Sequence, residues 1–125
     1  MIKLNKEVIL KKLKESILDK DKIIIISGAS LVIQNIINET WDIDLSCDID
    51  YYNLLDWDKK IGALGKEIKF NDVFEISNNL YYPEDIIIID GYKFMNLEKC
   101  LEIKKKLNRD KDRYIIDKLE KLLKD

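Results

Sequence analysis

Apolar positions follow helical spacing in some segments and form short runs or alternations in others. Residues 5 to about 19 place apolar side chains at helical spacing between lysines and glutamates, which predicts an amphipathic helix. Ile23 to Ile26 is a run of four β-branched residues, which predicts a short strand buried on both faces. A second strand is predicted from Trp41 to about Ile49, after a polar turn at residues 38–40.

A turn of small residues, 27–30, joins the first predicted strand to a helix. Gly28 permits a backbone conformation or a close approach that a Cβ would hinder. Ser30 is the predicted N-cap of the helix, which carries apolar residues up to Ile37. Such a turn presents backbone N–H groups, and it therefore suits an anion such as phosphate.

The middle of the chain mixes helical and strand signals. Residues 53–66 place leucines and an isoleucine on one side of a helix, and Gly65 is its predicted C-terminal signal. Strands are predicted at 68–77, 86–89 and 92–94, and the last two are joined by an Asp90-Gly91 turn. Trp41, Trp57 and Phe94 are interpreted as core or edge aromatics.

Two helices are predicted at the end of the chain. Asn96 caps the first, and residues 108–110 separate it from the second, 111–124. The inward positions of the second helix are predicted to be Tyr114, Ile115, Leu119, Leu122 and Leu123. The order of elements predicts an α/β (α+β) fold, a mixed β-sheet flanked by helices, in a single domain over residues 1–125.

Composition narrows the chemistry. The 125 residues have a net charge of −2, which argues against nucleic-acid binding driven by global charge. The absence of histidine excludes Ser-His and Cys-His triads and the commonest zinc ligand. Cys47 and Cys100 lack metal-ligand spacing, so we expect buried reduced thiols, although a disulfide between them stays open.

No apolar run approaches the roughly 18 residues that a membrane span needs. The first ten residues also lack the sustained apolar segment and cleavage site of a signal peptide. We therefore expect a cytoplasmic protein with no membrane partner.

Asp42 and Asp44 stand at the start of the second strand. Residues i and i+2 of a strand point to the same face, so the two carboxylates project side by side. Adjacent carboxylates repel unless a proton or cation lies between them, and a hard divalent metal is the usual solution. Together with the turn at Gly28, this pattern suits a nucleoside triphosphate and its Mg²⁺.

The run G-A-S at 28–30, followed by E-T-W-D-I-D-L-S at 39–46, resembles the minimal nucleotidyltransferases of the DNA polymerase beta superfamily. Residues 97–114, with Lys104 in a helix and an R-x-K-D turn at 109–112, resemble the C-terminal part of the same proteins. Residues 51–96 carry no motif that matches. The resemblance implies a small mixed sheet flanked by helices with two C-terminal helices.

The resemblance also implies roles for individual residues. Asp42 and Asp44 would bind Mg²⁺ and act in catalysis, and Gly28 and Ser30 would contact the triphosphate. Three cations, Lys104, Arg109 and Lys111, and the carboxylate of Asp112 are candidates for positioning nucleotide or substrate. Active relatives use a third carboxylate from a neighbouring strand, for which Glu75 is our first choice and Asp72 the second.

The function expected from this resemblance is Mg²⁺-dependent transfer of a nucleoside monophosphate, for example from ATP, to an acceptor hydroxyl or phosphate. The acceptor, a small molecule, a protein or an RNA, would lie between subunits of a homodimer or be supplied by a partner protein. Toxin–antitoxin systems use such minimal domains. The alternative is a catalytically degenerate relative that acts as a binding or inhibitory module, because Asn38 occupies a position where many relatives carry arginine.

Overall fold

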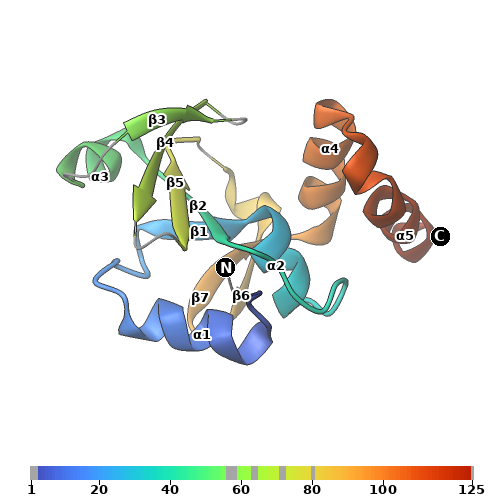
Figure 1. Ribbon diagram of the computed structural model, residues 1–125, viewed down its shortest axis with the longest axis horizontal. Helices are drawn as coiled ribbons and strands as arrows, with labels where there is room; N and C mark the ends of the chain where they lie inside the picture. Colours follow the sequence, from blue (N-terminus) through green and yellow to red (C-terminus); the bar gives the residue numbers. More distant parts are fainter. Residues whose placement is uncertain (1–2, 56–58, 63–64, 71–72, 80, 125) are drawn as a thin grey trace.

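A computed structural model describes residues 3–55, 59–62, 65–70, 73–79 and 81–124. Within these residues, seven strands form one mixed sheet in the order β3-β4-β5-β2-β1-β7-β6 (Figure 1). The strands are β1 (Ile23–Ile26), β2 (Ile43–Cys47), β3 (Lys59–Gly62), β4 (Gly65–Phe70), β5 (Phe74–Ser77), β6 (Ile86–Ile89) and β7 (Tyr92–Met95). The α-helices are α1 (Lys6–Glu15), α2 (Ser27–Ile33), α3 (Ile49–Leu54), α4 (Leu97–Leu107) and α5 (Arg113–Leu123). The predicted mixed sheet with flanking helices is thus confirmed.

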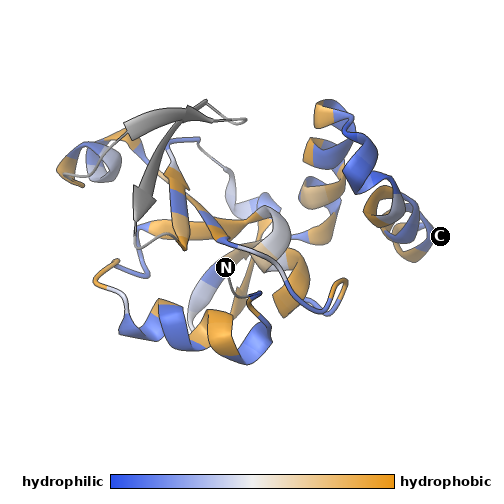
Figure 2. Cartoon of the chain, in the orientation of Figure 1, coloured by the Kyte–Doolittle hydropathy of each residue, from blue (hydrophilic) through white to orange (hydrophobic). Residues whose placement is uncertain are grey.

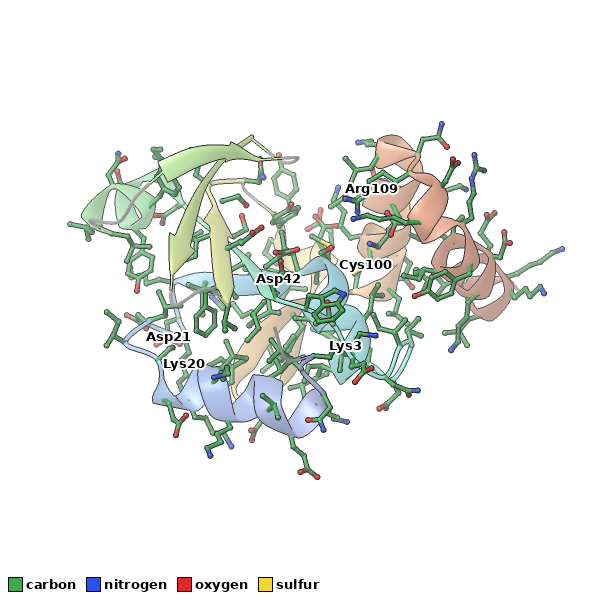
Figure 3. All side chains as sticks on the ribbon, viewed as in Figure 1. Lys3, Lys20, Asp21, Asp42, Cys100 and Arg109 are labelled. Atoms are coloured by element: carbon green, nitrogen blue, oxygen red, sulfur yellow. The ribbon has the colours of Figure 1, made fainter. Side chains whose placement is uncertain are left out.

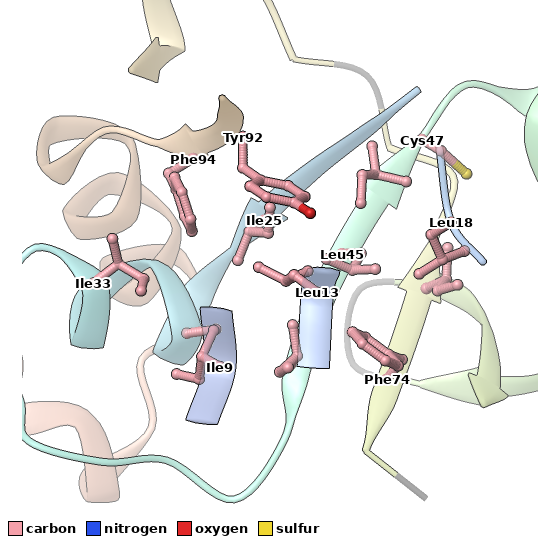
Figure 4. Packing of buried hydrophobic residues seen from close by; sticks show 14 of the residues in the cluster. Ile9, Leu13, Leu18, Ile25, Ile33, Leu45, Cys47, Phe74, Tyr92 and Phe94 are labelled. Carbon is pink, nitrogen blue, oxygen red and sulfur yellow. The ribbon is translucent and has the colours of Figure 1, made fainter. Parts of the chain in front are cut away.

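Two hydrophobic clusters hold the helices on the sheet. The larger one packs α1 and α2 against alternate residues of the central strands, including Ile25, Leu45 and Phe94 (Figure 4). The smaller one joins α4 and α5 to the ends of β1 and β7 through Ile26, Met95 and neighbouring residues. Figure 2 shows apolar residues concentrated in the central strands, while α1 carries polar residues on its outer side.

Polar side chains lie on one face of the sheet at β2. This strand pairs antiparallel with β1 and parallel with β5. Because successive side chains of a strand point to opposite faces, Asp44 and Ser46 lie on the face opposite Leu45. Leu45 belongs to the larger cluster, and Asp44 projects from the opposite face. The two C-terminal helices stand beside this opposite face (Figure 1).

The predicted helix over residues 53–66 is wrong. A short helix, α3, ends at Leu54, and the strands β3 and β4 follow. Gly65 begins β4 and pairs with Gly62 across the β3–β4 hairpin, so it is not a helix C-terminal signal. The predicted strand over 68–77 is divided between β4 and β5, and residues 56–58, 63–64 and 71–72 lie outside the described residues.

The remaining local predictions hold in part. Asp90 (φ 54°) and Gly91 (φ 82°) form the predicted turn between β6 and β7. The side chain of Asn96 accepts a hydrogen bond from the backbone N–H of Lys99 and caps α4 as predicted. On α5, however, Tyr114 and Leu122 are exposed, and Ile115, Ile116 and Leu119 are the buried positions.

Candidate active site

Three carboxylates converge where β2 and β5 run side by side. Asp44 pairs with Glu75 in the parallel register of the two strands, and Asp42 lies in the bend before β2. One carboxylate oxygen from each of the three residues lies within 4.8 Å of the others, and all three residues are half-buried. Glu75, the first choice for a third carboxylate, is therefore next to the Asp pair, whereas Asp72 lies outside the described residues.

A cleft of about 580 Å³ contains the three carboxylates. Its other wall comes from α4, α5 and the segment between them, including Lys104, Arg109 and Lys111. Figure 3 shows Asp42 on the sheet side and Arg109 at the end of α4. Anionic and cationic groups thus face one space, although they lie far apart in the sequence.

The turn after β1 forms part of the cleft through Ser27 and Gly28. Ser27 adopts φ 57°, a left-handed conformation that is uncommon for residues other than glycine. A Cβ added to Gly28 would lie 2.7 Å from Thr40 Oγ1, so this position requires glycine because of a close approach. The predicted close approach at Gly28 is therefore confirmed.

Ser30 is not the N-cap of the helix. Since α2 begins at Ser27, Ser30 falls inside the helix and is fully buried. Its Oγ donates a hydrogen bond to the backbone oxygen of Met95, 2.6 Å away, and Gln34 Nε2 lies 2.9 Å from the same Oγ. Ser30 does not line the cleft. Ser27 and Gly28 are the residues of this turn that do.

A buried carboxylate, Asp112, organises two of the three predicted cations. Its Oδ1 lies 3.2 Å from Lys104 Nζ, and its Oδ2 accepts a 2.8 Å hydrogen bond from Arg109 Nε. Burial raises the pKa of the Asp112 carboxyl, but the nearby Lys104 and Arg109 cations outweigh this effect and hold the pKa below its ordinary value. Lys104 is itself buried, so Arg109 and the exposed Lys111 are the cations with better access to the cleft.

Trp41, which the sequence pattern assigns to the core or an edge, is 51% exposed and lines the cleft. Lys3 Nζ lies 5.0 Å from the centroid of its ring. The resemblance names Asp112 as a candidate for positioning nucleotide or substrate, but it does not predict that Asp112 pairs with Lys104. The spacing of eight residues between Lys104 and Asp112 does not predict a contact, because the two side chains meet only when α5 folds back on α4.

The donor set fits a hard divalent cation. Carboxylate oxygens are the ligands that Mg²⁺ prefers, and opposite ligands of an octahedral Mg²⁺ lie about 4.2 Å apart, twice the usual metal–oxygen distance. Oxygens within 4.8 Å of one another can converge on one ion with small side-chain adjustments. A pair of ions about 4 Å apart would also suit three carboxylates.

Comparison with protein-family models, with curated proteins and with solved structures found no match to this chain. Among the helices in the described part of the chain, none has the length and apolar character needed to cross a bilayer.

Proposed function

We propose that this protein is a Mg²⁺-dependent nucleotidyltransferase, which transfers a nucleoside monophosphate from a nucleoside triphosphate to an acceptor. The observation that carries the proposal is the convergence of Asp42, Asp44 and Glu75 in a cleft with cationic residues on the opposite wall. The resemblance of residues 28–30, 39–46 and 97–114 to minimal nucleotidyltransferases also supports the proposal.

Each part of the cleft has a role in this reaction. The acceptor oxygen attacks the α-phosphorus, the bond to the bridging oxygen breaks, and pyrophosphate leaves. Asp42 and Asp44 would hold Mg²⁺, which when bound supplies positive charge to the phosphate oxygens. Glu75 accepts the proton of an acceptor hydroxyl, and the backbone at Gly28 lets the triphosphate approach closely. Arg109 and Lys111 offset the charge of the phosphates.

The test is to incubate the protein with each α-labelled nucleoside triphosphate and Mg²⁺, and to offer RNA, protein and small-molecule acceptors in turn. Pyrophosphate release and transfer of label are measured for the wild type, for Glu75→Gln and for the Asp42→Asn, Asp44→Asn double variant. The matched control is Glu84→Gln, which changes an exposed glutamate in the short helix before β6. Turnover that survives the double substitution would contradict the assignment of the metal site.

A second function, a non-catalytic binding or inhibitory module, is favoured by two observations. Asp112 pairs with Lys104 and Arg109, so part of the positive charge near the cleft is offset within the protein. Asn38 also replaces the arginine that many of the nucleotidyltransferases carry at this position. A wild-type protein that binds neither Mg²⁺ nor any nucleoside triphosphate would favour this second function.

A further inference from the structure

Aromatic and apolar side chains line the cleft together with its charged groups. Trp41 contributes from the sheet side, and Tyr114, Ile103 and Ile115 contribute from α4 and α5. Trp41 and Tyr114 are 51% and 63% exposed, respectively, so two large aromatic side chains are left open to solvent in the same cleft. We infer that Trp41 stacks on the nucleobase of the bound nucleotide, an inference that rests on the proposed nucleotidyl transfer.

The position of Trp41 in the chain supports this role. It immediately precedes Asp42, so the Cα atoms of the two residues are about 3.8 Å apart. The chain bends at residues 41–42, and both side chains line the cleft instead of pointing to opposite faces as in a regular strand. An aromatic ring is thereby placed beside the carboxylates that would bind the metal and the triphosphate.

A lysine of the N-terminal segment, Lys3, contacts one face of the indole. Lys3 Nζ lies 5.0 Å from the centroid of the Trp41 ring, a distance typical of a cation–π interaction. The same ammonium lies 3.5 Å from Glu39 Oε1. Since a cation can occupy only one face of the ring, the other face can stack on a planar group.

A nucleotide has both a charged part and a planar aromatic part, and the cleft has charged and aromatic residues that suit them. Its phosphates carry the negative charge that a metal and the Arg109 and Lys111 side chains would neutralise, and its base is planar and only weakly polar at its faces. Stacking on an aromatic side chain depends on the π-face that every base has, so it contributes affinity without requiring one particular base. We therefore expect Trp41 to strengthen the binding of purine and pyrimidine nucleotides, and purines more strongly because their rings are larger.

The experiment compares a nucleotide with a ligand that has three phosphates but no nucleoside. Calorimetric titrations in Mg²⁺ measure the affinity for adenosine 5′-(α,β-methylene)triphosphate, in which the bond that breaks is replaced, and for inorganic tripolyphosphate. Trp41→Ala is expected to weaken the nucleotide about 10- to 100-fold and to leave tripolyphosphate unchanged. Trp41→Phe keeps a stacking surface, and it should restore most of the affinity. Tyr82→Ala, which removes a 71%-exposed aromatic residue outside the cleft, is the matched control.

Each other result has a definite meaning. Equal nucleotide affinities for Trp41→Ala and the wild type would overturn the stacking role and leave the proposed function intact. Equal losses for nucleotide and tripolyphosphate would show that Trp41 supports the structure of the cleft, which also overturns it. A wild-type protein that binds neither ligand would remove the proposed function, and this inference would fall with it.

Discussion

Asp44 and Glu75 lie opposite each other on two neighbouring parallel strands, β2 and β5. The adjacent pairs in the register are Ile43 with Phe74 and Leu45 with Ile76, and all four of these residues are buried in the larger cluster. A slip of one residue would move the carboxylates into the core and the apolar residues out of it. Burial on one face of the sheet therefore fixes the position of the acids on the other.

Gly28→Ala tests the close packing under the turn. The new Cβ would lie 2.7 Å from Thr40 Oγ1, so either the turn or Thr40 must move. We expect the free energy of unfolding, measured by urea denaturation, to fall by about 1–3 kcal/mol. Adding Thr40→Ala should recover part of this loss by making room. An equal loss with and without Thr40→Ala would contradict the proposed clash.

Asp112→Asn tests the buried ion pair between α4 and α5. The substitution keeps the shape of the side chain but leaves Lys104 without its anionic partner, so a loss of about 3 kcal/mol in the free energy of unfolding is expected. Asp110→Asn is the matched control on the same segment, because that side chain is fully exposed and its ion pair with Arg113 is long, at 4.0 Å. Similar losses of unfolding free energy for both variants would argue against a stabilising ion pair between Asp112 and Lys104.

The same carboxylate predicts a pH dependence of stability. The pKa of Asp112 is lower in the folded protein than its ordinary value of 3.8, so its stabilising effect is complete above about pH 5. It is lost as the pH falls through the folded-state pKa, where the carboxylate binds a proton. The difference in unfolding free energy between the wild type and Asp112→Asn should therefore shrink on acidification from pH 6 to about pH 3. A difference that stays constant over this range would contradict the ionised pair.

The two cysteines are free and buried, as the sequence predicts. Burial raises the pKa of each thiol to about 11. At pH 8 only about one thiol in a thousand is then ionised, so both should react slowly with a disulfide reagent such as DTNB in the native protein. Both should react rapidly in urea. Rapid reaction of Cys100 in the native protein would show that the cleft exposes its thiol more than the structure indicates.

The sequence best predicts local conformations, which depend on residues that are close together in the chain. The four isoleucines of β1, the Asp90-Gly91 turn and the Asn96 cap each specify a local conformation, and all three are found. The position of Glu75 beside the Asp pair is a long-range feature, and only the family resemblance led us to expect a third carboxylate from a neighbouring strand.

Other features depend on contacts that the sequence does not display. Leu54, Leu55 and Ile61 match a helical pattern, yet Leu54 is exposed at the end of α3 and Ile61 lies in β3. Ser30 has the identity of a typical N-cap, but the N-cap of α2 is Ile26, so the helix begins four residues earlier than predicted. Trp41 is predicted to be a core or edge aromatic by its type, and it lies half-exposed in the bend before β2.

The most direct test of the account measures divalent cation binding by Asp42, Asp44 and Glu75, independently of any acceptor. Mn²⁺, which takes similar oxygen ligands and is visible by electron paramagnetic resonance, is titrated into the wild type, Asp44→Asn, Glu75→Gln and the control Glu84→Gln. We predict that the wild type and the control bind Mn²⁺ with the same affinity, that excess Mg²⁺ displaces it, and that the two site variants bind at least about 10-fold more weakly. Equal binding by all four proteins, or no binding by the wild type, would contradict a metal site at these carboxylates.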